Sequence, residues 1–235
     1  MQKLELGLLG PLEARVGGAP VALGSPRERA VLAFLALNRG PVSAARLVDE
    51  LGTTPAALDV YVARVRRRLG RSAVATGTGG YALAIEPDGV DATVFEAVVD
   101  RARAVGAAER SELLARALAL WRGPALADVA GEQFARAEIA RLEELRLAAH
   151  EARLEAELEL GREADAVPLL AALVVEHPFR ERLCALLMTA LYRVGRQADA
   201  LAVYRDARRR LADELGVAPG PELRRVETAV LHQKL

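Results

Sequence analysis

The chain has 235 residues, which fits one large domain or two ordinary ones. Hydrophobic residues make up 52% and charged residues 27%, so the chain can bury a core and lacks the composition of a disordered protein. Aromatic residues make up only 4%, which argues against a large all-β protein and against an aromatic cofactor or sugar site. The formal net charge is zero, so an electrostatic partner must be recognised by a local patch rather than by a global field.

Residue usage also excludes several kinds of site. Cys184 is the only cysteine, which excludes a disulfide framework or thiolate metal cluster within one chain and suits a reducing cytoplasm. No uninterrupted apolar run reaches the roughly 18 residues that span a bilayer, and no apolar leader precedes Gly10. The three histidines are far apart, and no Ser/His/Asp spacing indicates a catalytic triad. We therefore expect a cytoplasmic protein that is not an enzyme, with no metal, no cofactor and no membrane partner.

The first 90 residues alternate short strands and helices. Leucines alternating with polar residues, separated by glycine turns, predict strands at 4–8, 12–16 and 21–23. Ser25 and Glu28 form an S-x-x-E capping box that opens a helix ending near residue 38. Two further helices are expected, one capped by Ser43 and one running from Thr54-Pro55 to Leu69, followed by a hairpin over 74–85 with its turn at 77–80.

From Asp91 onward the pattern is entirely helical. Asp91 is expected to cap a helix over about 92–105, followed by helices over about 109–122 and 132–160. Residues 161 and 195 then begin similar segments at an offset of 34, the period of tetratricopeptide repeats. The identities at this offset are Gly161/Gly195, Arg162/Arg196, Ala164/Ala198, Asp165/Asp199 and Ala166/Ala200. A plain helical bundle with a chance coincidence is the alternative to such a repeat.

The helix over 54–69 carries a basic face. Leu58, Val62, Val65 and Leu69 form its core face, while residues 56–82 hold five arginines against one acid, Asp59. Such a face is typical of a helix that reads the DNA major groove, where arginine binds phosphate or guanine and small apolar residues meet thymine methyl groups. A solvated charged face is the alternative, but a preceding helix and a following hairpin favour DNA binding. The candidate DNA-binding residues here are Val60, Ala63, Arg64, Arg66, Arg67, Arg68, Arg71 and, in the hairpin turn, Thr78.

Several longer strings resemble one family of regulators. Residues 8–13 (LLGPLE), 25–30 (SPRERA) and 60–67 (VYVARVRR) resemble the Streptomyces antibiotic regulatory protein family. Residues 119–126 (ALWRGPAL), 177–181 (HPFRE) and 218–223 (APGPEL) are similar to its bacterial transcriptional activator domain, as are 134–138 and 141–146. The resemblance covers essentially the whole chain.

This resemblance implies a fold, a function and partners. The fold is mainly α with a small β component: an OmpR-like winged helix-turn-helix over 1–89 and an all-α, tetratricopeptide-like activator domain over 90–235. The function is sequence-specific transcriptional activation, by binding direct repeats of double-stranded DNA near promoters of secondary-metabolite clusters and contacting RNA polymerase. Arg64, Arg66 and Arg67 fall in the family's recognition helix, and Ser43 falls where a helix N-terminus faces a phosphate. Self-association through residues 90–235 is a further expectation.

Three features depart from the family pattern. The loop before the recognition helix is reduced to 52–55, Asp59 stands where members often carry glutamine, and the hairpin lacks the usual arginine before its Gly-Tyr pair. All three predict weaker or altered DNA binding. They support an alternative in which the chain is a protein-interaction module acting through its helical domain. An enzyme has little support, because the glycine-rich stretch 77–80 lacks the Lys-Ser/Thr of a phosphate-binding loop.

Overall fold

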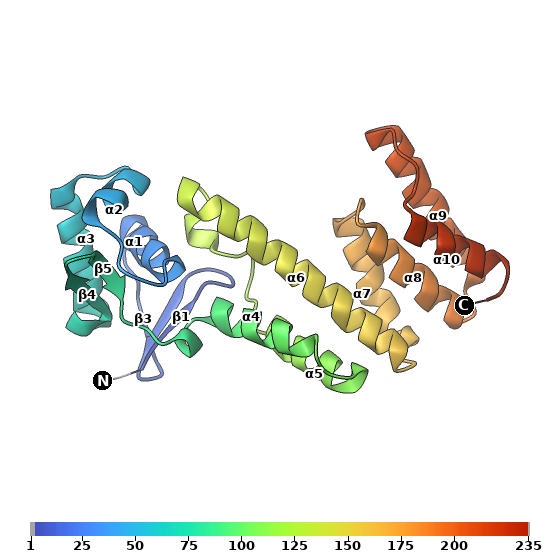
Figure 1. The fold of residues 1–235 in the computed structure, drawn as a ribbon, viewed down its shortest axis with the longest axis horizontal. Coiled ribbons are helices and arrows are strands. Elements are labelled where there is room, and N and C mark those ends of the chain that lie inside the picture. Colours follow the sequence, from blue (N-terminus) through green and yellow to red (C-terminus); the bar gives the residue numbers. More distant parts are fainter. Residues whose placement is uncertain (1–2, 235) are drawn as a thin grey trace. The chain divides into compact units, whose positions relative to one another are not determined.

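The computed structural model describes residues 3–234 (Figure 1). Helices predominate over two small sheets, which confirms the predicted fold class. The fold forms two compact units. The first contains the described residues up to Arg101 together with Arg116–Leu147. The second contains Ala102–Ala115 together with the described residues from Ala148 on. The boundary between residues 89 and 90 that the sequence predicts follows the change from mixed to helical texture, and remains a prediction.

The first unit opens with a three-stranded antiparallel sheet in the order β1-β2-β3. The strands are β1 (Leu4–Gly7), β2 (Glu13–Val16) and β3 (Ala19–Val21). The third strand was predicted two residues later than it occurs. Gly17 and Gly18, with φ of 59° and 83°, make a two-residue turn, so pairing resumes at once between Val16 and Ala19.

Three helices and a hairpin follow, in the predicted order. The helices are α1 (Pro26–Leu37), α2 (Ala44–Glu50) and α3 (Pro55–Leu69), and the hairpin strands are β4 (Val74–Gly77) and β5 (Gly80–Leu83). A short 3₁₀ turn over Arg71–Ala73 connects α3 to β4, and a second lies at Pro87–Gly89. The hairpin turn is tighter than predicted, because Gly77 pairs directly with Gly80 and leaves only Thr78 and Gly79 unpaired. In Figure 1 the hairpin, α2 and α3 lie together.

The start of the helical region is built into the first sheet. Helix α4 (Asp91–Ala102) begins at Asp91 itself, and the carboxylate accepts from the amides of Leu8 and Leu9 at 2.7 and 3.2 Å. The prediction that Asp91 is the cap residue preceding this helix was therefore wrong. Helix α5 (Ala107–Leu118) ends four residues earlier than predicted, because the Arg122 amide donates to the Leu9 carbonyl at 2.8 Å instead of continuing the helix.

Further contacts within the first unit continue this packing. The amide of Leu126 donates to the Leu8 carbonyl at 2.8 Å, just before a 3₁₀ turn at Ala127–Val129. Phe134, near the start of α6 (Gln133–Glu159), meets Phe34 of α1 edge to face, with ring centroids 5.0 Å apart. The DNA-binding part predicted from the sequence thus belongs to one compact unit with residues 91–101 and Arg116–Leu147.

The second unit contains the 34-residue repeat. After the parts of α5 and α6 that this unit contains, its helices are α7 (Glu163–Glu176), α8 (Glu181–Arg193), α9 (Gln197–Arg210) and α10 (Pro221–Leu231), with a π-helical turn at Leu211–Leu215. Gly161 and Gly195 lie between paired helices with φ of 72° and 80°. After each glycine, the next amide donates to a carbonyl five residues earlier, at 2.9 Å in the first copy and 2.8 Å in the second. Ala166 and Ala200 are 2% and 0% exposed, so both copies use a small residue where helices approach.

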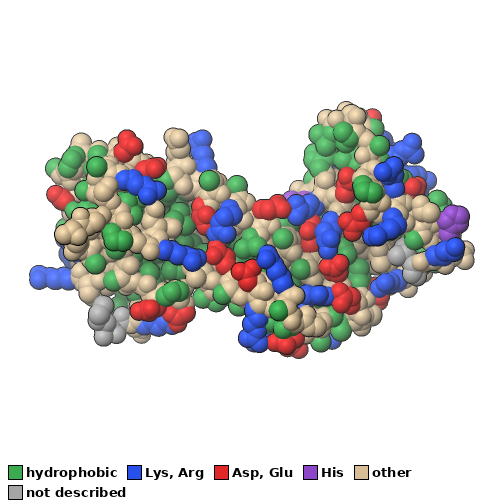
Figure 2. Space-filling model, viewed as in Figure 1, with side chains coloured by type: hydrophobic (Ala, Val, Ile, Leu, Met, Phe, Trp, Pro, Cys, Tyr) green, Lys and Arg blue, Asp and Glu red, His purple; other side chains and the backbone are tan. Residues whose placement is uncertain are grey.

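Charge on the helical surface is mixed. On the face drawn in Figure 2, Lys and Arg side chains are interspersed with Asp and Glu side chains over the helices. Ion pairs join neighbouring helices of the second unit, among them Arg182–Glu155 at 2.9 Å and Arg193–Glu163 at 3.2 Å. This pattern agrees with the zero net charge and directs attention to local basic surfaces.

Candidate nucleic-acid interface

Helix α3 is defined at both ends by its sequence. The Thr54 hydroxyl accepts from the Ala57 amide at 3.3 Å, and Pro55 occupies the first turn, where its missing amide costs nothing. Gly70, with φ of 101°, ends the helix in a conformation that favours glycine. The predicted core face is confirmed, because these four side chains are at most 6% exposed: Leu58, Val62, Val65 and Leu69.

The opposite side of α3 is open. Ala56, Val60, Ala63 and Arg67 recur at spacings of four, three and four residues, so they share one side of the helix. All four are exposed, Val60 to 46%. We call these four residues the outward face of α3. Within residues 3–234, the Arg67 guanidinium has no hydrogen-bond or ion-pair partner.

One flank of α3 is held by α1. The carboxylate of Glu28 is 2% exposed, accepts from Nε of Arg68 at 2.9 Å and lies 3.6 Å from Nη1 of Arg64. The Ser25 hydroxyl donates to the same carboxylate at 3.1 Å. Burial alone raises the pKa of Glu28, but the hydrogen bonds from Arg68 and Ser25 outweigh it, and the pKa is lowered from its ordinary value. The carboxylate therefore stays charged between α1 and α3.

The other flank is held by the hairpin. Arg66 donates to the Val74 carbonyl from Nε at 2.9 Å and from Nη2 at 2.8 Å, and also to the Thr76 hydroxyl. Asp59 accepts from the Tyr81 hydroxyl at 2.9 Å, and this hydrogen bond, with burial, raises the pKa of Tyr81. Asp59 is thus bound to the hairpin tyrosine, which the sequence analysis did not predict.

Backbone pairing anchors the hairpin to the segment before α2. Amide and carbonyl groups of Val42 and Tyr81 exchange two hydrogen bonds of 2.8 Å. A Cβ at Gly80, where φ is 109°, would lie 2.0 Å from the Val42 carbonyl oxygen, so only glycine allows this approach. At the free end of the hairpin, Thr78 is exposed.

Two predicted site residues lie beside α3. Ser43 caps α2, since its hydroxyl accepts from the Arg46 amide at 3.2 Å, as the sequence predicts. Arg71 lies just beyond the C-terminal end of α3 and is exposed. The structure therefore brings Arg67, Val60 and Ala63 to one open face and engages Arg66 and Arg68 on its flanks. Arg64 combines both features, because its side chain is 46% exposed and also forms an ion pair with Glu28.

Glu28 and Tyr81 belong to this site, although the sequence did not predict either of them there. Glu28 was interpreted only as the capping partner of Ser25, although α3 places arginines 64 and 68 one turn apart on one side. Tyr81 was interpreted only as a strand residue. Both contacts join residues at least 22 positions apart, which local periodicity does not report.

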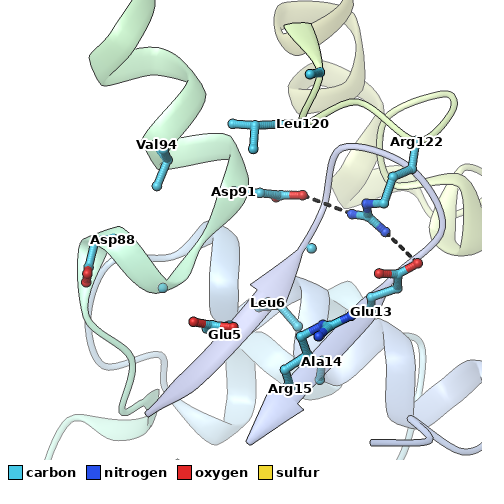
Figure 3. A pocket seen from close by; sticks show the side chains of 13 residues that line it. Glu5, Leu6, Glu13, Ala14, Arg15, Asp88, Asp91, Val94, Leu120 and Arg122 are labelled. Carbon is cyan, nitrogen blue, oxygen red and sulfur yellow. Dashed lines mark hydrogen bonds and ion pairs between the residues drawn. The ribbon is translucent and has the colours of Figure 1, made fainter. Parts of the chain in front are cut away.

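A separate cleft of about 400 Å³ lies in the first unit between β1, β2, α4 and residues 119–122 (Figure 3). Arg122 extends across it, with Nη2 2.9 Å from Asp91 and Nη1 3.1 Å from Glu13. Nη1 also donates to the Pro11 carbonyl at 2.8 Å. These contacts attach residue 122 to the first sheet.

The described residues form neither a cluster of metal ligands nor a membrane-spanning helix. Across the part of the chain that the structure describes, no three His, Cys, Asp or Glu side chains gather as metal ligands would. No helix within residues 3–234 has the length and apolar character needed to cross a membrane.

Comparison with known proteins gives a consistent picture. The model of the bacterial transcriptional activator domain matches residues 90–231. Regulatory protein AfsR of Streptomyces griseus is 43% identical over 239 residues, covering 97% of this chain and 24% of AfsR. Transcriptional regulator RedD of Streptomyces coelicolor is 42% identical over 248 residues, covering 98% of this chain and 71% of RedD. The chain thus spans about a quarter of AfsR and less than three quarters of RedD.

A solved structure is similar as well. Mycobacterium tuberculosis EmbR, in complex with a low-affinity phosphopeptide, aligns with a TM-score of 0.92 at 37% identity. The alignment covers all of this chain and 66% of the EmbR chain. EmbR therefore shares this fold over the full length of the present chain and continues beyond it.

Proposed function

This chain belongs to the Streptomyces antibiotic regulatory protein family of transcriptional regulators, and we propose that it is a sequence-specific DNA-binding transcriptional activator. One observation carries the proposal. The two flanks of α3 are bonded to α1 and to the hairpin. Between them lies the outward face, which ends in Arg67, an arginine with no hydrogen-bond or ion-pair partner among the described residues. A rigid helix with one exposed arginine and small apolar neighbours fits the major groove, which admits an α-helix.

Each exposed residue has a proposed role. Arg67 binds a guanine edge or a phosphate, with Arg64 beside it, and Val60 and Ala63 meet thymine methyl groups. Ser43 and Arg71 lie near the ends of α2 and α3, where backbone amides and side chains contact phosphates. Thr78 approaches a minor groove at the hairpin tip.

Two arginines have a different proposed role. Arg66 and Arg68, which already bond the hairpin and Glu28, add positive charge to the surface and hold its shape. Both can still attract phosphates through that charge.

The finer parts of the proposal follow from the family. We propose that the protein acts in the cytoplasm on direct repeats of double-stranded DNA near promoters, contacts RNA polymerase, and activates a secondary-metabolite cluster. Self-association through residues 90–235 would allow neighbouring copies to occupy adjacent repeats. No cofactor, metal ion or catalysis is needed for this activity.

The test replaces Arg67 by alanine and measures binding to a duplex selected by the parent protein from a random DNA pool. If Arg67 reads a base, binding to the selected duplex weakens by about 1–3 kcal/mol and specificity relaxes at one position. If it holds a phosphate, binding weakens on every sequence and the salt slope falls by about one.

The matched control is Arg136→Ala, because Arg136 is an exposed arginine on α6, a different helix of the same unit. Removal of its charge should leave binding to the selected duplex nearly unchanged. If Arg67→Ala behaves like the control, or if the parent selects no duplex, the DNA-binding proposal is wrong. The protein-interaction module acting through the helical domain then becomes the better hypothesis.

A further inference from the structure

Glu28 stands out among the charged residues of the first unit because it is buried and faces the recognition helix. Its side chain is 2% exposed, and both carboxylate oxygens point to α3 residues or to Ser25. The chain closes over it at Gly24, where φ is 83° and a Cβ would lie 2.2 Å from Oε2. The site is therefore built around one carboxylate.

The two arginines at this carboxylate are held to different degrees. Arg68 donates through Nε at 2.9 Å and through Nη1 to the Ala22 carbonyl at 3.4 Å. Arg64 approaches only to 3.6 Å, which is an ion pair without a close hydrogen bond, and its side chain is 46% exposed. Arg68 therefore serves as the fixed partner, while Arg64 is restrained but free to leave.

From this asymmetry we infer that Glu28 is a positioning residue for DNA recognition, which holds Arg64 beside the outward face of α3 and keeps Arg68 away from the DNA. The inference rests on the proposed function. An arginine that is already restrained loses less side-chain entropy on binding, and its charge is aimed at one location. Glu28 also cancels one positive charge at this surface, which limits attraction to DNA of any sequence.

For Glu28→Gln in the full chain we expect two changes in DNA binding. Without the charge, Arg64 is no longer restrained, so the ratio of affinities for the selected duplex and for a scrambled duplex falls about threefold to tenfold. At the same time, affinity for the scrambled duplex rises, and its salt slope steepens by up to about 0.9, the value for one phosphate contact.

Two further variants separate geometry from charge. Glu28→Asp keeps the charge but withdraws the carboxylate from Arg64, so the affinity ratio should fall while the salt slope stays the same. In an Arg64→Ala background, Glu28→Gln should change the ratio less than about twofold, because coupling between two groups vanishes when one is absent. A purely structural role would lower both affinities together and persist in that background.

Glu132→Gln is the matched control. Glu132 lies 3.5 Å from Arg27 of α1 and, within residues 3–234, has no hydrogen bond or ion pair with α3, so its loss should leave the affinity ratio unchanged. If Glu28→Gln lowers both affinities equally, or acts equally with and without Arg64, the positioning role is refuted while the DNA-binding proposal stands. If the parent shows no preference between the duplexes, both fail together.

Discussion

Replacement of Asp91 by alanine tests how the first sheet is joined to the helical region. The Asp91 carboxylate accepts from the amides of Leu8 and Leu9 and pairs with Arg122 at 2.9 Å. Its side chain is only 16% exposed, so water replaces these contacts poorly. Alanine at this position leaves the amides of Leu8 and Leu9 and the Nη2 group of Arg122 without their acceptor.

The expected cost follows from these contacts. A buried donor that loses its acceptor costs about 1–3 kcal/mol, and part of this is recovered through the partial exposure of the site. Arg122 is 29% exposed and retains Pro11 and Glu13, so its loss is smaller. We expect Asp91→Ala to lower the free energy of unfolding of the first unit by about 2–4 kcal/mol.

Tryptophan fluorescence during urea unfolding measures this directly, because Trp121 is the only tryptophan and lies in the first unit, edge to face with Phe95. The control is Asp88→Ala, since Asp88 is 68% exposed and, within residues 3–234, forms an ion pair only with Lys3 at the surface. It should leave the urea midpoint almost unchanged. If the two variants unfold at the same urea concentration, the account of Asp91 is wrong.

Three further predictions concern the hairpin and the repeat. Gly80→Ala should break the pairing with Val42 and weaken DNA binding, whereas Gly77→Ala, with open space at its Cβ, should not; gel-shift titration compares them. The pKa of Tyr81 is raised in the folded protein, so the hydroxyl loses its proton at a lower pH in the unfolded chain than in the folded one. The contribution of Tyr81 to the free energy of unfolding is therefore lost as the pH rises above about 10. Ultraviolet titration of the parent against Tyr81→Phe would show the shifted group, and a normal value would contradict it. Ala200→Leu should cost about 1–3 kcal/mol by overpacking, measured by circular dichroism, and an unchanged transition would refute the close helix approach.

Local sequence signals predicted most helices and strands, because the ends of these elements depend on residues only a few positions apart. The caps at Ser25, Ser43 and Thr54 and the glycine stop at Gly70 set helix ends through contacts within a few positions. The 34-residue identities likewise reported a real equivalence, since both glycines adopt the same left-handed conformation.

Contacts between residues far apart in the sequence could not be predicted from such local signals. The role of Asp91 as an acceptor for Leu8 and Leu9, 83 and 82 positions earlier, leaves no periodic trace. The same holds within the candidate interface. The outward face of α3 follows from helical spacing, whereas which arginines are held depends on Glu28 and on the hairpin carbonyl of Val74.

The hydrogen bonds between the β1–β2 connection and residues 122–128 bear on how this protein could be recombined. The Leu12 amide donates to Asp128, and Arg122 and Leu126 bond the chain at Leu9 and Leu8. In a chimera joined at residue 90, Leu8, Leu9 and Leu12 would come from one protein and their hydrogen-bond partners in residues 122–128 from another. The two segments would have to match for these hydrogen bonds to form. A joint within α6 near residue 147 keeps these hydrogen bonds within one protein. Exchange of DNA specificity between relatives is then expected to carry the first 147 residues, provided that Ala102–Ala115, which belong to the second unit, still match the residues after the joint, as Ser111 must match Glu157.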